Sequence, residues 1–436
     1  MKPSRITLAT FAAFILSISA VGQHRAARSA TATQPWVQLA KLTSNTTNAF
    51  YTGPAVAISG NVIVVGSEYG QQASVYVSSS GNWKDMVETA TLYASDEMSC
   101  DVFGTSVSIS GNTIVVGDPE DNPACILTQP GAAYVFVEPA GGWAGTLTET
   151  AKLTASDALA GAGVGSSVSI DGDTIIAGAP GTYTSGVNGA AYVWVKPSGG
   201  WSSGTQTAQL TASDAVAGDL FGNSVSISGG VAVVGSPYIH SNHNHEGAAY
   251  VFVEPASGWA NATQNAELIA SDPLAYGSMG ISVGISGQTV VAGAYADVGS
   301  NQAQGAAYVF VEPLGGWKDT TQVAKLTASD GHFDDLFGTS VAIDGNLIAA
   351  GSIYFSRSSH RNTSVFWREG AAYVFQKPAG GWTDITQTAQ LNGADARYDT
   401  KFGTSVAVGG QVVAVGVPNG NRNPGAGYVF SPFTPQ

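Results

Sequence analysis

Hydrophobic and polar positions along the chain follow one unit that recurs with small changes. In residues 106–110, Ser-Val-Ser-Ile-Ser, the two kinds alternate with the period of a strand that has two different faces. Gly111-Asn112 then predicts a two-residue hairpin turn, and the continuously apolar residues 113–117 predict a strand buried on both faces. Residues 132–137 predict a third strand, and residues 149–154 predict an outer, more polar fourth strand.

The unit occurs seven times, and no stretch between the copies shows a helical period. The copies of the first strand open at Thr52, Phe103, Val164, Phe221, Met279, Phe337 and Phe402, at spacings of 51 to 65 residues. Seven repeats of four antiparallel strands predict an all-β fold, a seven-bladed β-propeller.

The two ends of the chain complement each other. The last copy ends after its third strand, residues 427–430, whereas the other copies continue with a Trp and an A-x-L strand. Those missing parts stand near the N-terminus, as Trp36 and residues 39–42. We therefore expect the N-terminal strand to complete the last blade, because closure of the ring removes exposed sheet edges.

Two sequence motifs of the repeat resemble those of a known family. The F-G pair that opens several first strands, together with Gly178-Ala179-Pro180, resembles the FG-GAP repeat family, which forms the seven-bladed propeller of the integrin α head. Residues 131–136 and 154–157 look most like the variant common in exported bacterial proteins. The resemblance covers residues 36–430 and implies the propeller fold, but a fold alone does not fix a function.

The connection between the first and second strands departs from the integrin pattern. Integrin-type blades often carry a D-x-D-x-D-G loop there that binds calcium, and such a site needs six to eight oxygens. Here the connection is a bare hairpin turn, and Asp171 and Asp173 are interpreted as turn formers. We predict no calcium site and no other cofactor.

Charge and the chain ends indicate where the protein works. A formal net charge of −14 disfavours non-specific binding to nucleic acid or to an anionic membrane. Residues 1–22 combine a basic start with an apolar run, which predicts a signal peptide and a secreted or cell-surface protein that is not inserted in the membrane. Residues 23–35 are then a linker, residues 36–430 the propeller and residues 431–436 a tail.

Three residue types recur or pair in ways that allow two interpretations each. Cys100 and Cys125 lie between strands of one repeat, where they form either a disulfide or two free buried thiols. One Trp per unit either fills a gap between blades or forms a ring of stacking platforms for sugars. Asp pairs before the first strand either accept backbone N–H groups in turns or line one mouth of the channel. The recurring residues are Trp36, Trp83, Trp143, Trp201, Trp259, Trp317 and Trp382, with the pairs Asp96 and Asp101, Asp214 and Asp219, and Asp330 and Asp335.

Two connections between the second and third strands break the repeat. The blade 4 connection holds three histidines and a glutamate, which is either a metal site for zinc, copper or nickel or a solvated polar loop. The blade 6 connection, residues 353–369, gathers arginines and aromatics, the residues enriched at interaction hot spots, and is either a ligand-binding patch or a basic loop. The metal candidates are His240, His243, His245 and Glu246, and the ligand-binding candidates are Tyr354, Arg357, His360, Arg361, Trp367 and Arg368.

Catalytic motifs do not decide the function. The sequence has no nucleophile elbow, H-E-x-x-H, P-loop or dinucleotide fingerprint. The favoured hypothesis is a non-catalytic binding or adhesion propeller. It recognises an extracellular protein or glycan through one face of the ring, which carries both the loops after the second strands and the loops after the fourth strands. The alternatives are a secreted polysaccharide lyase or hydrolase that uses the channel mouth, and an inert structural module.

Overall fold

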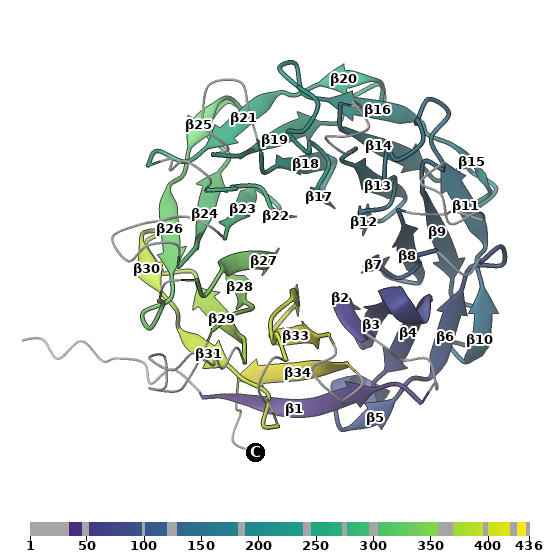
Figure 1. Ribbon diagram of the computed structural model, residues 1–436, viewed down its shortest axis with the longest axis horizontal. Coiled ribbons are helices and arrows are strands. Elements are labelled where there is room, and N and C mark those ends of the chain that lie inside the picture. Colours follow the sequence, from purple (N-terminus) through teal and green to yellow (C-terminus); the bar gives the residue numbers. More distant parts are fainter. Residues whose placement is uncertain are drawn as a thin grey trace, which may run out of the picture. The chain divides into compact units, whose positions relative to one another are not determined.

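The repeats form a closed ring of seven sheets around a central axis (Figure 1). The computed structural model describes residues 35–45, 52–97, 101–119, 129–181, 188–238, 246–272, 277–295, 304–332, 334–355, 369–395, 400–418 and 425–432. Within these residues the helical elements are two short 3-10 turns, η1 (Glu68–Gly70) and η2 (Ser79–Gly81). The prediction of an all-β, seven-bladed propeller is confirmed.

Each blade has four main strands, described here from the inside of the ring outward, with blade 7 given last. The first strands are β2 (Thr52–Ser59), β7 (Ser106–Ser110), β12 (Ser167–Asp171), β17 (Ser224–Ser228), β22 (Ser282–Ser286), β27 (Phe337–Asp344) and β32 (Ser405–Gly409). The second strands are β3 (Val62–Ser67), β8 (Thr113–Asp118), β13 (Thr174–Ala179), β18 (Val231–Ser236), β23 (Thr289–Ala294), β28 (Leu347–Ser352) and β33 (Val412–Val417). The third strands are β4 (Gln72–Val77), β9 (Ala132–Val137), β14 (Ala190–Val195), β19 (Ala248–Val253), β24 (Ala306–Val311), β29 (Ala371–Gln376) and β34 (Ala426–Pro432). The fourth strands are β6 (Ala90–Tyr93), β11 (Ala151–Thr154), β16 (Ala208–Thr211), β21 (Ala266–Ile269), β26 (Ala324–Thr327), β31 (Ala389–Leu391) and β1 (Trp36–Thr43).

Six sheets also gain a short parallel strand at their outer edge, which the sequence pattern does not predict. The strand comes from the following blade, just before that blade's own fourth strand, and it covers the outer edge of the sheet. These strands are β5 (Met86–Val87) on β1, β10 (Gly145–Thr148) on β6, β15 (Gly204–Thr205) on β11, β20 (Ala262–Thr263) on β16, β25 (Thr320–Thr321) on β21 and β30 (Ile385–Thr386) on β26. In the described part of the chain, β31 of blade 6 has no such partner.

The ring closes through the N-terminal strand, as predicted. β1 runs antiparallel to β34, from the pair Trp36 and Pro432 to the pair Leu42 and Gly427, and Figure 1 shows the two strands side by side. Ala40 and Leu42 of β1 are completely buried in the core between blades 7 and 1. The last strand extends to Pro432, two residues past the predicted end of the propeller.

The glycines of the F-G and G-A-P phrases are two sides of one contact between blades. Gly178 is the last residue but one of β13, and a Cβ added there would lie well under 3.0 Å from the carbonyl oxygen of Gly222, the F-G glycine of the next blade. Gly222 has a φ of +97°, in the left-handed region, where a side chain would also be strained. The same close approach joins all seven blade pairs: Gly66 to Gly104, Gly117 to Gly165, Gly235 to Gly280, Gly293 to Gly338, Gly351 to Gly403 and Gly416 to Gly53.

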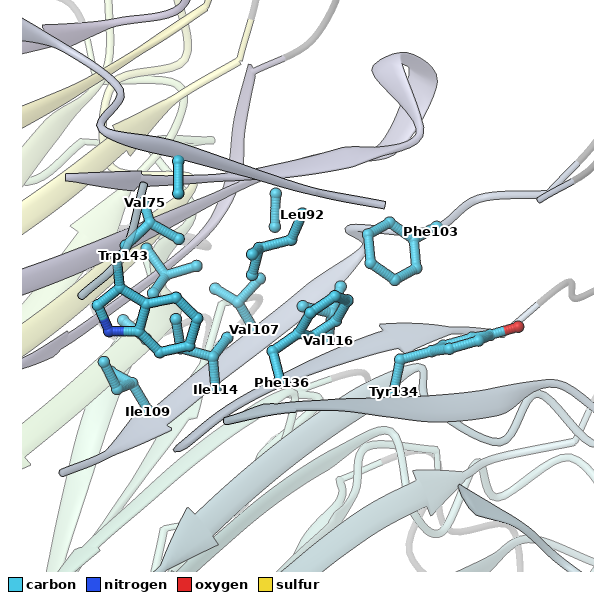
Figure 2. Packing of buried hydrophobic residues seen from close by; sticks show 14 of the residues in the cluster. Val75, Leu92, Phe103, Val107, Ile109, Ile114, Val116, Tyr134, Phe136 and Trp143 are labelled. Carbon is cyan, nitrogen blue, oxygen red and sulfur yellow. The ribbon is translucent and has the colours of Figure 1, made fainter. Parts of the chain in front are cut away.

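The cores lie between neighbouring blades. In the core shown in Figure 2, Trp143 and Ile114 of blade 2 pack in one cluster with Val75 and Leu92 of blade 1. Six of the recurring tryptophans are buried in this way, which excludes the interpretation of these six as exposed platforms: Trp83, Trp143, Trp201, Trp259, Trp317 and Trp382. Trp36 differs, because it lies on β1 itself and is half-buried, so its assignment to this set is wrong.

The first strands are joined by their polar side chains. The hydroxyl oxygen of Ser108 on β7 accepts the N–H of Ile170 on β12 at 3.1 Å, and similar serine bonds recur around the ring. Asp171 continues the series, because its carboxylate accepts the N–H of Gly229 in the next blade at 2.6 Å. Asp171 therefore bonds across the blade interface and does more than form its turn. The connection between β7 and β8 is a two-residue turn, and the prediction that no calcium binds there stays a prediction.

Candidate functional site

The loops after the second and the fourth strands lie on one face of the ring, which we call the loop face. The N–H of Tyr238, after β18, donates to the carbonyl oxygen of Asp219, before β17, at 3.1 Å. The N–H of Tyr354 donates to the carbonyl oxygen of Asp335 in the same way at 3.2 Å. These bonds bring together the two kinds of loop that the sequence analysis placed on one face.

The first aspartate of each pair binds the neighbouring blade. Asp96, after β6 of blade 1, accepts the hydroxyl of Tyr134 from β9 of blade 2 at 3.0 Å. Lys152 adds an ion pair to the same carboxylate at 2.7 Å and lies 5.2 Å from the centre of the Tyr134 ring. Burial acts to raise the pKa of Asp96, but its bond to Lys152 holds that pKa below the usual value. The contact recurs in Asp214 with Tyr250, Asp272 with Tyr308, Asp330 with Tyr373 and Asp395 with Tyr428.

In two of the three pairs the second aspartate bonds within its own loop. The buried carboxylate of Asp219 accepts the N–H of Val216 at 3.0 Å, and that of Asp335 accepts the N–H of His332 at 2.7 Å. The turn interpretation is thus confirmed for these two residues. No group of three or more metal-ligating side chains occurs in the residues that the structure describes.

Buried tyrosines of the Asp–Tyr contacts are expected to make the ring sensitive to alkali. Burial, and then the nearby aspartate, raise the pKa of Tyr192 to about 12 and raise that of Tyr250 and Tyr373 as well. In the unfolded chain tyrosine ionises near pH 10, so above that pH the folded state binds more protons than the unfolded state. The free energy of unfolding should therefore fall from about pH 10 through the folded pKa, by at most about 1.4 kcal/mol per pH unit for each tyrosine.

Urea unfolding at a series of alkaline pH values measures this slope. Tyr250→Phe should make the fall less steep, because it removes one titrating group. A free energy of unfolding that does not change between about pH 9.5 and 11.5 would contradict the prediction.

Three consecutive blades place a tyrosine on the loop face one or two residues after the second strand. Tyr238 of blade 4 and Tyr295 of blade 5 join their hydroxyl oxygens at 3.2 Å, although 57 residues separate them. The hydrogen bond to Tyr295, together with burial, raises the pKa of Tyr238 to about 12. Tyr354 holds the corresponding place in blade 6, and all three side chains are half-buried. Tyr295 was not predicted from the sequence, although its place after the apolar strand was a signal.

The ends of the blade 6 loop are tied together on this face. The carbonyl oxygen of Phe355 accepts the N–H groups of Glu369 and Gly370, both at 3.0 Å. Phe355 is itself buried, with its ring edge-on to Tyr373. Tyr354 is the described member of the predicted ligand-binding set. The others, Arg357, His360, Arg361, Trp367 and Arg368, lie outside the described residues.

The other candidates are placed only in part. Glu246 lies on the loop face, where its carbonyl oxygen accepts the N–H of Met279 at 3.0 Å. His240, His243 and His245 of the metal hypothesis lie outside the described residues, as do Cys100 and Cys125 of the disulfide hypothesis. Both hypotheses stay predictions.

Comparison with known proteins identifies the repeat. No curated protein matches the chain. No helix in the described part is long and apolar enough to cross a membrane. The FG-GAP repeat family matches residues 86–136, 147–194, 205–252, 262–310 and 320–375, more than half of the sequence. Each match starts at the outer strands of one blade and ends in the third strand of the next. The chain therefore belongs to the FG-GAP repeat family.

Proposed function

We propose that this chain is an exported, non-catalytic binding or adhesion propeller that recognises a protein or a glycan outside the cell. The FG-GAP propeller fold supports a binding role in general. The apolar run in residues 1–22 supports export. The ligand binds on the loop face of blades 4 to 6.

The contact between Tyr238 and Tyr295 carries this proposal. Tyrosine combines an apolar ring with a hydroxyl group and loses little conformational entropy on binding, so it is common at recognition surfaces. Tyr354 continues the series into blade 6, where the next fourteen positions include Arg357, Arg361 and Arg368. Because the chain has a net charge of −14, these arginines favour an acidic or aromatic partner at this place.

The test begins with a glycan array and a panel of extracellular proteins, both probed with the secreted chain. A variant with Tyr238→Ala, Tyr295→Ala and Tyr354→Ala should bind the ligand found there at least about thirtyfold more weakly, since an anchor residue contributes about 2 kcal/mol. A control with Leu314→Ala and Lys196→Ala, in loops on the opposite face, should bind as the unchanged protein does. Equal affinity of the tyrosine variant and the control would contradict the proposal.

One observation favours the secreted polysaccharide-active enzyme as the second candidate. Burial, and then the charge of Asp101, raise the pKa of Glu97 to about 7. A carboxyl group with a raised pKa beside a second carboxyl group is the usual arrangement of a general acid. Hydrolysis or cleavage of a polysaccharide that is lost in Glu97→Gln would establish this candidate in place of the first.

A further inference from the structure

The outer edge of blade 6 differs from the outer edges of the other blades. The other six sheets end in a short parallel strand from the next blade, but β31 has no such strand in the described part of the chain. Ala389 of β31 is partly exposed, whereas the equivalent alanine of every other fourth strand is at most 1% exposed. β31 therefore presents an uncovered sheet edge on the rim of the ring.

The backbone of β31 also lacks a hydrogen bond that its equivalents make. In blade 3 the N–H of Gln209, on β16, donates to Oδ1 of Asn261 from the next blade at 2.8 Å. Gln390 is the equivalent residue of β31. Its side chain bonds to Asp330, but within the described residues no side chain accepts its backbone N–H. Four other fourth strands make the bond: Lys41 with Asp85, Lys152 with Ser203, Glu267 with Asp319 and Lys325 with Asp384.

The interface between blades 6 and 7 also lacks the buried tryptophan that each of the other six contains. Those tryptophans stand seven or eight residues before the alanine of the fourth strand, as Trp201 stands before Ala208. Trp36 stands four residues before Ala40, and it is only half-buried beside the core of this interface. The segment that carries tryptophan, acceptor and edge strand in other repeats therefore has no counterpart directly before β1.

The sequence explains the missing acceptor. In the other repeats the acceptor stands five residues before the alanine of the fourth strand, and the edge strand follows it at once, as β20 follows Asn261. Pro35 holds this place before Ala40. The next residues stay beside β34, where Trp36 pairs with Pro432, so they do not cross to blade 6.

A groove lies where the edge strand runs in other blades, and we call it the seam groove. In blade 3 the edge strand pairs with Leu210 and Thr211, and the equivalent residues Leu391 and Asn392 line the groove. Its volume is about 350 Å³, and most of the surface that it exposes is polar, as expected for a strand edge with unpaired backbone groups. The lining residues are Trp36, Gln38, Gln390, Leu391, Asn392, Gly393, Ala394 and Phe430.

We propose that the seam groove binds an extended segment of a partner protein, which adds to β31 as a parallel strand. Strand addition of this kind takes its affinity from main-chain hydrogen bonds and its specificity from side chains. The chain's own edge segments define those side chains, because each segment covers an equivalent edge. The partner segment should therefore carry Asp, Asn or Ser two residues before Thr or Val. The five segments with this pattern are Asp85-Met86-Val87, Ser203-Gly204-Thr205, Asn261-Ala262-Thr263, Asp319-Thr320-Thr321 and Asp384-Ile385-Thr386.

The geometry favours another chain over the chain's own N-terminal residues as the source of this strand. Trp36 and Leu391 line the same groove, so β1 starts beside the place of the added strand. A connection between parallel strands takes a dozen or more residues. After the proposed removal of residues 1–22, thirteen residues, 23–35, precede Trp36, and such a connection leaves almost none of them for the strand itself.

This surface goes beyond the proposed function, because the seam groove shares no residue with the tyrosines of the loop face. The two proposals can fail separately. Loss of the array ligand in the tyrosine variant says nothing about the seam groove, and peptide binding at the seam groove says nothing about the loop face.

The probe is a blocked peptide with the sequence of residues 318–323, Lys-Asp-Thr-Thr-Gln-Val, titrated into the millimolar range against the secreted chain. NMR of the labelled protein should show saturable binding. Hydrogen exchange of the Gln390 amide should slow about tenfold or more at saturation, because this amide gains a hydrogen bond. Exchange of the Gln209 amide, which already donates to Asn261, should not change.

Matched variants remove the new bonds from either side. A peptide with Asp319→Ala lacks the acceptor and should bind about tenfold more weakly. A peptide with Thr320→Pro and Thr321→Pro lacks two backbone N–H groups and should not bind. In the protein, Gln390→Pro should fold, since proline is tolerated on an edge strand whose N–H faces outward, and it should lose the peptide. If Gln390→Pro does not fold, the proline peptide provides the same test.

Three results would overturn the proposal. The first is no saturable binding of the peptide, or equal binding of the proline peptide. The second is a Gln390 amide that is as protected from exchange as that of Gln209 before any peptide is added, because the edge would then already be covered. The third is binding only to a chain that lacks residues 23–34, because the chain's own N-terminal segment would then fill the groove.

Discussion

A chain that lacks residues 35–43 is expected to lose most of the stability of the ring. The deletion removes β1, which pairs with β34 over nearly its whole length and buries Ala40 and Leu42 completely. It also leaves the edge of β34 unpaired and opens the core that contains Ile63 and Tyr76. Loss of these contacts should cost about 5 kcal/mol or more, which is comparable to the whole stability of an ordinary domain. Thermal and urea unfolding measure the effect.

A permuted chain provides the control. Because Trp36 pairs with Pro432, a short loop can join the end of β34 to β1 and make the closing strand continuous with its partner. This chain should unfold at or above the midpoint of the natural order, while the deletion unfolds far below it. A deletion that melts as the intact protein does would show that β1 is not needed for closure.

Gly178→Ala is expected to destabilise the protein by more than about 3 kcal/mol, since a well-packed contact must move apart to admit even one methyl group. The added Cβ would meet the backbone of Gly222 in the next blade, and backbone cannot turn aside as a flexible side chain can. The seven equivalent contacts hold successive blades at one spacing. A shift at one of them therefore strains the closed ring.

Gly199→Ala is the matched control. Gly199 has no heavy atom of another residue within 4 Å of the added Cβ, and it lies on the exposed surface. The urea midpoint of this variant should change little, while that of Gly178→Ala falls steeply. Similar midpoints for the two variants would mean that the blades tolerate a wider spacing than the glycine contact indicates.

Much of the fold could be predicted because its main signals are local. Alternation in residues 106–110 predicts a strand with two different faces, and the unbroken apolar run that follows predicts a fully buried strand. The structure has both: Val107 and Ile109 are buried while Ser108 and Ser110 are only partly buried, and every residue of the second strand is buried. The number of repeats defines the number of blades. The edge strands were missed because two residues such as Gly204 and Thr205 are too few to show a period.

The candidate site was harder to predict because its contacts join distant parts of the sequence. Asp96 and Tyr134 each recur in the repeat, but nothing local shows that one binds the other across a blade interface. Tyr238 and Tyr295 likewise lie far apart in the sequence, and nothing local shows that their hydroxyl groups meet. Trp36 is different, because its shorter distance from Ala40 was visible in the sequence and shows that it cannot take the buried place of Trp201.

The offset between sequence repeat and blade has a consequence for how such rings change in evolution. A segment such as residues 147–204, one full repeat that includes Trp201, supplies the outer strands of one blade and the inner strands of the next. Tandem duplication of that segment in the gene would thus insert a complete interface, with its glycine contact, serine bonds and buried tryptophan already matched. Recombination between repeats can add or remove a blade without creating an unpaired edge, and the terminal strand that closes the ring stays the same.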